Sequence, residues 1–547
     1  MEFDLSMVLV NALLARIKAD STLAERLSTY SFTNGRILVP DHLFDTDELN
    51  TLEQLAAESG DRALQLQIIA TRRIRFDKWR FTATDLESLI PRLQEYFADE
   101  AIDGWIYRRN RDGVMLPWLV ESITFRHRQE GVPGGLPYVS VQLLANTQAA
   151  TAPMGKAQPN QWRAGMTNSM IFYEREMGKL SIPEMMARKG FYKECPEFKE
   201  DYEKQVALFK RYQSQYGQQF RAINSAFMIT RSESSSVFNK SEFFRLPPGS
   251  MFKCVNDEEE IERRLETHST DNAACVTGTS GLIPIHCYLH MFHLDLHKNC
   301  WVHVQNLKEY EYRPELKNKL ILPVEHRRLI DILTSHMDVL MDDIIEGKSG
   351  GTTILCMGAP GLGKTLTAEV YSEVVGKPLY RVHSGQLGTT AQSVEAALAD
   401  ILKRASRWDS ILLIDEADLY IRKRDNNLEH NAIVAEFLRT LEYFSGLLFL
   451  TTNREDDVDD AILSRCIAVI RYETPSRDAA IRLWHSLADQ FEVDLSDELV
   501  YKLVRDFPNS SGRDIKELLK LTSRLCRSTN TPITLEAFHE CAVFRGK

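Results

Sequence analysis

The sequence lacks the features that mark secreted, membrane-spanning and metal-ribbon proteins. Its nine cysteines include no Cys-x-x-Cys pair, which argues against a disulfide framework or a zinc ribbon. The N-terminal segment lacks the basic start of a signal peptide. No apolar run approaches the ~20 residues that are needed to cross a bilayer. We therefore expect a protein of the reducing cytoplasm that has no membrane partner.

An excess of positive charge is also missing. The chain has 66 Lys and Arg against 77 Asp and Glu, a net charge of -11. This balance argues against a protein that coats nucleic acid, although a local basic patch remains compatible with it. Hydrophobic residues make up 44% and charged residues 26%, as in ordinary globular domains. A length of 547 residues predicts about three or four domains of ~150 residues each.

The N-terminal part of the chain divides into two regions by pattern. Residues 1–145 are expected to form an α+β subdomain, with one or two amphipathic helices in residues 1–30. Strand-like alternation over residues 62–145 includes Gly104–Tyr107 and Ser122–Phe125. The first region is therefore predicted to be helical at its start and to contain strands from residue 62 onward.

Residues 146–318 are expected to form a second subdomain. The region starts with a polar, aperiodic segment that indicates a loop or a boundary. Aromatic residues from Phe198 to Phe220 then recur at spacings of three to four, which predicts a long helix. Such a stripe suits a partner helix, but packing into the protein's own core is the commoner explanation. Residues 240–312 return to strand-like patterns.

A glycine-rich segment, Gly358-Ala-Pro-Gly-Leu-Gly-Lys-Thr365, lies between the apolar run Thr353–Met357 and the helical pattern Leu366–Val375. A strand, a glycine-rich loop and a helix in this order build a phosphate cradle, because backbone N–H groups face the phosphates. Lys364 adds a positive charge there, and the Thr365 hydroxyl can ligate Mg²⁺. The residues expected to bind ATP are Gly358, Ala359, Pro360, Gly361, Leu362, Gly363, Lys364, Thr365 and Leu366.

Two carboxylates end the apolar run Ile411–Ile414. Central parallel strands are apolar on both faces, and ligands gather at their carboxyl ends. We therefore expect Asp415 to lie beside Mg²⁺, mostly through water, and Glu416 to polarise the attacking water. In a sequence without other motifs, an Asp-Glu pair at the end of an apolar strand is commonly only a structural cap. About 50 residues after a phosphate loop, the catalytic interpretation is favoured over the structural one.

Three polar residues farther along the chain complete the pattern. Asn453 ends the apolar run Leu448–Thr452 and is placed to hold the attacking water. Arg465 is either a surface salt-bridge residue or an arginine finger that reaches a neighbouring subunit's nucleotide. Arg513 begins a helical pattern, where it either belongs to a capping segment or reaches back to the phosphates.

These elements, in this order and spacing, resemble the AAA branch of the AAA+ ATPases over roughly residues 318–547. The resemblance implies an α/β fold, with a doubly wound parallel sheet in residues 319–473 and a helical lid in residues 474–547. A large α+β region precedes this single ATPase module. The resemblance also implies ATP and Mg²⁺ as ligands and assembly into a hexameric ring.

The resemblance assigns a role to each motif. The segment that ends at Thr365 resembles Walker A, and the one that ends at Glu416 resembles Walker B. Asn453 resembles sensor 1, Arg465 the trans-acting arginine finger, and Arg513 sensor 2. A second finger is not evident, because Arg471 falls too late in the sequence.

The expected first pore loop, Ser384–Thr390, departs from the pattern of threading machines. It follows the predicted strand Leu379–His383 and contains no aromatic residue, so that Leu387 is its only hydrophobic contact. This composition favours remodelling or gating over processive threading of an unfolded chain.

Two weaker signals lie before the ATPase module. His286, His290, His293 and His297 would follow one side of a helix and could bind a metal there, but the segment alternates like a strand, and nearby carboxylates are not evident. Arginines mix with aromatics in Arg72–Arg80 and Tyr107–Arg111. That mixture suits single-stranded nucleic acid, and it equally suits a solvated sheet face.

The sequence therefore predicts a ring-forming ATPase that couples ATP hydrolysis to remodelling of a protein partner or complex, with specificity set by residues 1–318. Two other classes stay open. One is a nucleic-acid-associated AAA+ motor or loader, and the other is a nucleotide-gated assembly scaffold.

Overall fold

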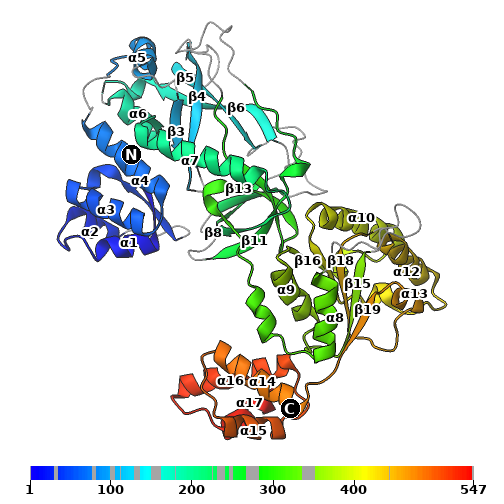
Figure 1. Cartoon of the computed structure of the whole chain (residues 1–547). Helices are drawn as coiled ribbons and strands as arrows, with labels where there is room; N and C mark the ends of the chain where they lie inside the picture. The colour runs from blue at the N-terminus through cyan, green and yellow to red at the C-terminus, as the bar shows by residue number, and fades with distance from the viewer. Residues whose placement is uncertain are drawn as a thin grey trace. The chain divides into compact units, whose positions relative to one another are not determined.

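The computed structural model separates into two compact units (Figure 1). The N-terminal unit comprises Met1–Tyr216 and Phe220–Glu309, and the C-terminal unit comprises Gly217–Gln219 and Tyr310–Lys547. The structure describes residues 2–29, 35–76, 82–98, 105–110, 113–127, 136–148, 162–178, 180–223, 226–230, 241–245, 250–266, 283–335, 351–442 and 444–544.

The N-terminal unit begins with a small α/β layer. Strand β1 (Glu2–Ser6) pairs antiparallel with β2 (Arg36–Pro40). The helices that follow in the chain are α1 (Met7–Leu14), α2 (Thr22–Thr29), α3 (Thr46–Glu58), α4 (Arg62–Phe76) and α5 (Leu86–Ala98). Two helices lie within residues 1–30, as predicted, but a strand precedes them.

The prediction of strands throughout residues 62–145 is wrong for its first part, which forms α4 and α5. Helix α4 is buried on two sides. Leu64 and Ile68 join one hydrophobic cluster, whereas Leu66, Ala70 and Ile74 join another. Apolar residues on opposite faces of a buried helix alternate along the sequence, which imitates the period of a strand.

Two larger sheets complete the N-terminal unit. A five-stranded antiparallel sheet has the order β6-β5-β4-β3-β7. Its strands are β3 (Trp105–Arg109), β4 (Met115–Arg126), β5 (Tyr138–Gln148), β6 (Trp162–Tyr173) and β7 (Phe191–Lys193), and α6 (Ile182–Arg188) precedes β7. Strands β3 and β4 confirm the two specific segments predicted within residues 62–145.

The second sheet has seven strands in the order β10-β9-β13-β12-β11-β8-β14. Their bounds are β8 (Gln219–Ile223), β9 (Ala226–Thr230), β10 (Ser241–Arg245), β11 (Met251–Asn256), β12 (Tyr288–His293), β13 (Lys298–His303) and β14 (Leu307–Glu309). The strand-like pattern of residues 240–312 is thus confirmed for the described part of that range.

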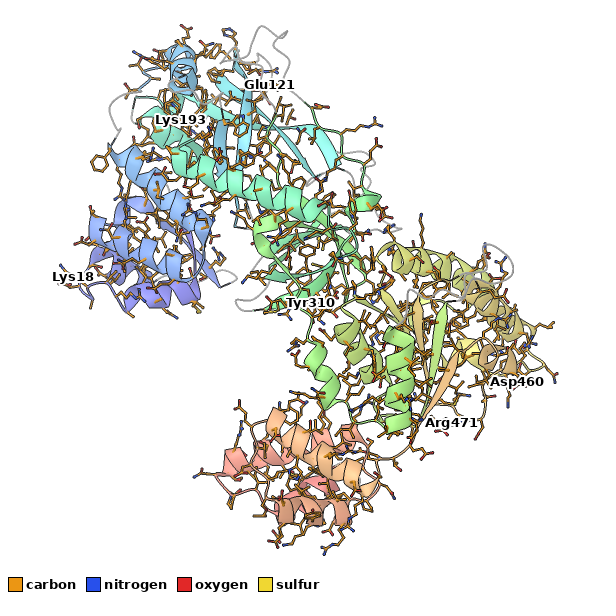
Figure 2. All side chains as sticks on the ribbon, in the orientation of Figure 1. Lys18, Glu121, Lys193, Tyr310, Asp460 and Arg471 are labelled. Atoms are coloured by element: carbon orange, nitrogen blue, oxygen red, sulfur yellow. The ribbon has the colours of Figure 1, made fainter. Side chains whose placement is uncertain are left out.

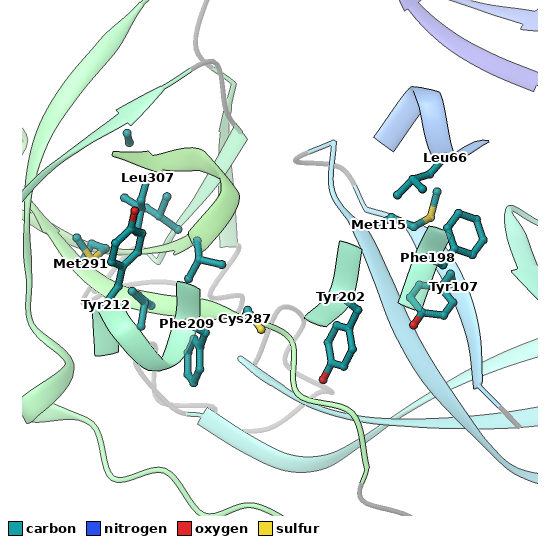
Figure 3. Close-up of a cluster of buried hydrophobic side chains, with 14 of the residues drawn as sticks. Leu66, Tyr107, Met115, Phe198, Tyr202, Phe209, Tyr212, Cys287, Met291 and Leu307 are labelled. Carbon is teal, nitrogen blue, oxygen red and sulfur yellow. The ribbon is translucent and has the colours of Figure 1, made fainter. Parts of the chain in front are cut away.

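Helix α7 (Pro196–Gln213) joins the cores of both sheets. Figure 3 shows Phe198 beside Tyr107 and Met115 of one sheet, and Tyr212 on the side of Met291 of the other. The aromatic stripe of this helix therefore packs into the protein's own core. The last stripe residues lie beyond the helix: Tyr216 is exposed, and Phe220 is buried in β8.

The C-terminal unit holds a parallel five-stranded sheet in the order β16-β17-β18-β15-β19. The strands are β15 (Thr352–Gly358), β16 (Leu379–His383), β17 (Ile411–Asp415), β18 (Leu447–Thr452) and β19 (Ala468–Tyr472). The central strands β17 and β18 are buried at every residue. This burial explains their continuous apolar sequences.

Helices precede and connect these strands, as in a doubly wound sheet. They are α8 (Val324–Ser335), α9 (Lys364–Val375), α10 (Ala391–Arg407), α11 (Asp418–Ile421), α12 (Leu428–Leu441) and α13 (Asp460–Leu463). Helices α8 and α9 contact each other, as do α10 and α12 (Figure 1). At the sheet's edge, Arg471 of β19 is exposed and points away from the sheet (Figure 2).

The chain ends in a helical subdomain with its own core. Its helices are α14 (Arg477–Gln490), α15 (Asp497–Asp506), α16 (Gly512–Thr529) and α17 (Leu535–Val543). Trp484 and Phe538 meet edge to face in that core, with ring centroids 5.5 Å apart. Across the residues that the structure describes, no helix combines the length and the apolar character of a membrane span.

Candidate active site

The glycine-rich loop leaves β15 and enters α9 at Lys364. Gly358 and Gly361 have φ angles of 147° and 86°, in the region that glycine adopts without strain. A Cβ on Gly358 would lie 2.4 Å from the Tyr472 carbonyl oxygen, and one on Gly361 would lie 2.8 Å from Ser511 Oγ. Glycine therefore lets the loop pack against β19 on one side and the start of α16 on the other.

Lys364 ties this loop to the end of β18. Its Nζ donates to the Gly358 and Ala359 carbonyl oxygens at 2.7 and 2.8 Å and to Asn453 Oδ1 at 2.9 Å. Burial lowers the pKa of Lys364, and the charge of Asp415 opposes that shift in part. Two residues that lie 89 positions apart in the sequence thus meet at the carboxyl end of the sheet.

Asp415 is held by three partners at the end of β17. Its Oδ1 accepts from Thr365 Oγ1 at 2.8 Å and from Thr451 Oγ1 at 2.6 Å, and its Oδ2 accepts from Arg381 Nη2 at 2.6 Å. Burial raises the pKa of Asp415, but the hydroxyl hydrogen bonds and the Arg381 charge together lower it below its usual value. The carboxylate is therefore charged at neutral pH, beside the Thr365 hydroxyl.

Arg381 and Thr451 are site residues that the sequence analysis missed. Arg381 lies on β16 and also pairs with Glu369 of α9, at 3.4 Å. The available signal was a charged residue in the middle of an otherwise apolar strand, Leu379-Tyr-Arg-Val. Thr451 carried no comparable signal, because hydroxyl residues are common near strand ends.

Replacing Arg381 with alanine is expected to lower the thermal unfolding midpoint by a pH-dependent amount. The folded-state pKa of Asp415 is depressed, so this pair stabilises the fold above the unfolded pKa of ~3.9 and loses its effect as pH falls through the folded value. The difference from wild type should be constant between about pH 8 and pH 5 and shrink below about pH 4. Thermal scans of both proteins across this range measure it, and a difference that already changes above pH 6 would contradict the assignment.

Glu416 directly follows Asp415, but it has a different environment. Its backbone is left-handed, with a φ of 55°, and its N–H donates to Thr451 Oγ1 at 2.9 Å. A non-glycine residue in this conformation costs on the order of 1–3 kcal/mol. The turn leaves the Glu416 side chain exposed, while Asp415 stays buried.

Asn453 follows the last residue of β18 and is oriented by a second carboxylate that the sequence analysis missed. Asp418 Oδ1 accepts from the Asn453 backbone N–H at 3.2 Å and from the Thr452 hydroxyl. The Asn453 amide oxygen meets Lys364. Asp418 therefore fixes the backbone of Asn453, whose side chain contacts Lys364 of the phosphate loop.

Arg513 lies close to the same loop. It is the second residue of α16, and its backbone N–H donates to the Gly361 carbonyl oxygen at 3.3 Å. Ser511 and Asp514 cap the helix reciprocally. The predicted cap is thus present, and it also brings Arg513 to the loop.

Arg465 stands apart from these residues. It follows α13, and its guanidinium donates to Glu442 Oε1 and, at 3.1 Å, to the Ala461 carbonyl oxygen. In the part of the chain that the structure describes, no hydrogen bond or ion pair joins Arg465 to the phosphate loop of its own chain.

The segment expected to form the first pore loop differs from the prediction in one respect. Strand β16 ends at His383 as predicted, but Leu387 is fully buried. Tyr420 fixes the backbone around it by donating to the Ser384 and Gly388 carbonyl oxygens, both at 2.7 Å. Leu387 is therefore a core residue and is not available as a contact.

The residues at the loop fit a magnesium nucleotide. The Thr365 hydroxyl and the charged Asp415 carboxylate are 2.8 Å apart, and oxygen ligands of this kind suit Mg²⁺. The loop, the N-terminus of α9 and Lys364 supply the donors and the positive charge that phosphate requires. The arrangement can therefore bind a nucleoside triphosphate with its metal.

A family model described as "ATPase family associated with various cellular activities (AAA)" matches residues 354–474. The uncharacterized AAA family ATPase y4kL of Sinorhizobium fredii is 33% identical over 132 residues, which cover 22% of this chain and 39% of that protein. Lon protease 4 of Sorangium cellulosum is 25% identical over 256 residues, which cover 40% of this chain and 31% of that protein. The chain thus spans 39% or less of the length of these curated relatives. A solved structure, the FIGL-1 AAA domain in complex with ADP, aligns with 41% of this chain and 82% of that one, at 16% identity and a TM-score of 0.34.

Proposed function

Because residues 354–474 form an AAA ATPase domain, we propose that this chain assembles into a ring, most simply a hexamer, and uses ATP hydrolysis to remodel a protein partner or complex. The domain implies ATP binding. We propose in addition that the ring acts on its partner in the cytoplasm.

The observation that carries the proposal is the convergence of four predicted residues at one sheet edge. Lys364 lies 2.9 Å from Asn453, and Thr365 lies 2.8 Å from Asp415. A phosphate loop alone would bind nucleotide. The added carboxylate and amide are what hydrolysis needs, because they position the metal and the attacking water.

We assign roles to the residues on this basis. Thr365 and Asp415 would hold Mg²⁺, which when bound would neutralise charge on the phosphates. Glu416, exposed beside the buried Asp415, would polarise the attacking water, and Asn453 would orient it. Arg513 would sense the phosphates from the lid.

The ring is supported by the position of Arg465. Its guanidinium pairs with Glu442, and among the described residues it makes no ion pair with the phosphate loop of its own chain. In a ring it would leave Glu442 and reach the nucleotide of a neighbouring subunit, where added positive charge stabilises the transition state.

The N-terminal region, residues 1–318, would contact the partner. Burial of Leu387 leaves the expected pore loop without an exposed apolar residue, which supports reshaping of a folded partner over threading.

The nucleic-acid hypothesis gains no support from four of the described arginines, whereas Arg108 is exposed and lies over the Phe191 ring, 4.9 Å from its centroid. Arg72 pairs with Glu53 at 2.6 Å, and Arg73 pairs with Glu197 at 2.9 Å. The remaining pairs are Arg75 with Asp41 at 3.9 Å and Arg109 with Asp61 at 2.9 Å. These cations are matched by carboxylates of the same unit. Residues 77–81 and 111 lie outside the described residues.

A substrate trap tests the proposal. Glu416→Gln would be purified with ATP and Mg²⁺, and everything it retains would be identified by mass spectrometry and nucleic-acid staining, with Lys364→Ala as the matched control. A specific protein that is retained by the trap and absent from the control would support remodelling. Nuclease-sensitive nucleic acid would overturn it in favour of a motor or loader, and retention of the chain alone would favour the scaffold.

A further inference from the structure

A second cluster of charged and metal-ligating side chains lies in the N-terminal unit, far in sequence from the ATPase motifs. Strand β11 pairs antiparallel with β12, so that Val255 faces Phe292 and Asn256 faces Met291. One residue farther, the Asp257 N–H donates to the His290 carbonyl oxygen at 2.9 Å. The strand register therefore places Asp257 opposite His290, although 32 residues separate them in the sequence.

A 3₁₀ turn, Glu258–Glu260, adds a second carboxylate to the same place. The Glu260 N–H donates to the Asp257 carbonyl oxygen at 3.2 Å, and side chains three residues apart eclipse each other in such a turn. One ligand atom from each of Asp257, Glu260 and His290 lies within 4.8 Å of the other two. Asp257 and His290 are buried, whereas Glu260 is exposed.

His290 has a ring nitrogen, Nε2, that is available as a ligand atom. Its Nδ1 lies 3.2 Å from the Asp257 carbonyl oxygen, which can only accept a hydrogen bond, so Nδ1 carries the proton. Nε2 therefore presents its lone pair, and it is buried with no hydrogen-bond partner among the described residues. A carbonyl that fixes the tautomer in this way is the usual second contact of a metal-binding histidine.

The other charged groups around the cluster have their own partners. Glu258 is buried, accepts from the His290 backbone N–H at 2.6 Å, and pairs with Arg263 at 2.5 Å. Trp301 packs beside the His290 ring, with centroids 5.0 Å apart. Glu258 and Trp301 thus hold the histidine in place.

We propose that Asp257, Glu260 and His290 bind a divalent transition metal, with Zn²⁺ as the best match to one imidazole and two carboxylates. Ligand atoms that each lie about 2 Å from a metal are at most ~4 Å apart. The exposed Glu260 side chain would therefore move inward by up to ~1 Å on binding. The bound metal would clamp the turn after β11 to β12.

In the sequence, the only signal for a metal site in this region is the spacing of the four histidines. The structure separates them: His286 bonds to Thr147 and to the Pro117 carbonyl oxygen, and His293 Nδ1 accepts from the Asp295 N–H. Only His290 meets carboxylates that could complete a site in the described residues. Those carboxylates lie 30 or more residues earlier in the sequence, which is why the histidine spacing could not reveal them.

Zinc titration of the full chain tests the proposal. The nucleotide-free protein would be stripped with EDTA and titrated with Zn²⁺ by calorimetry, and bound zinc would be counted by elemental mass spectrometry. The variants are Glu260→Gln and Asp257→Asn, which keep side-chain shape. Glu259→Gln is the matched control, because Glu259 is exposed on the same turn and outside the cluster.

We expect wild type and Glu259→Gln to bind one Zn²⁺ equivalent that Asp257→Asn lacks. Glu260→Gln should weaken that equivalent by about 10–100-fold or more, since even partners of metal ligands have effects of this size. Circular dichroism of each variant would verify its fold. Equal zinc affinity and stoichiometry in all four proteins would overturn the site, as would the absence of zinc binding to wild type. Neither result depends on ATP hydrolysis.

Discussion

Replacing Arg465 with alanine is expected to lower kcat for ATP hydrolysis by about 10³–10⁵-fold, the range measured for arginine fingers. ATP binding should change little, because Arg465 makes no contact with the phosphate loop of its own chain among the described residues. Steady-state hydrolysis and nucleotide titration measure the two effects separately. Arg471→Ala is the matched control, since Arg471 is an exposed arginine on the nearby strand β19.

Mixing two inactive variants distinguishes a finger that acts across subunits from a structural arginine. The Arg465→Ala chain keeps its phosphate loop, and the Lys364→Ala chain keeps its arginine. A mixed ring would therefore contain some interfaces with both parts intact, and a fraction of the activity should return. Activity that stays absent in rings shown to be mixed would contradict the trans assignment.

Replacing Glu416 with glutamine is expected to lower kcat by about 10²–10⁴-fold, the usual contribution of a general base. ATP affinity should be retained, because Lys364, Thr365 and Asp415 are untouched and the Glu416 backbone bond to Thr451 does not involve its side chain. Single-turnover hydrolysis and equilibrium binding of ATP test both halves of this expectation.

The control for Glu416→Gln is Glu455→Gln, which removes a charge from an exposed glutamate just after Asn453. Glu455→Gln should hydrolyse ATP at the wild-type rate. If Glu416→Gln instead loses ATP binding, then the Glu416 carboxylate helps to hold the nucleotide site together, and its assignment as the base is wrong.

The ATPase domain was predictable because its chemistry is local in sequence. The strand, loop and helix around Lys364 are contiguous, and the run that ends at Asp415 is apolar because both of its faces are buried. The contacts of Asp415 were not predictable to the same extent. Arg381 and Thr451 reach it from two neighbouring strands, and only the strand order brings them there.

The N-terminal unit was harder to predict because its decisive contacts are distant in sequence. Strand β1 pairs with β2 at separations of 30 residues or more, so nothing near Glu2–Ser6 marks it as a strand. Helix α4 is buried in two clusters at once, which removes the single apolar stripe that identifies a helix. In both cases tertiary packing, and not local propensity, determines the element.

Helix α7 has a mechanical consequence for the N-terminal unit. Its 18 residues form a rod about 27 Å long. Phe198 near one end is packed with the five-stranded sheet, and Tyr212 near the other end is packed with the seven-stranded sheet. Neither sheet can separate from the rod without exposing large aromatic side chains. Mechanical force applied to either sheet should therefore be transmitted through α7 to the other, and the two sheets should unfold in one cooperative event.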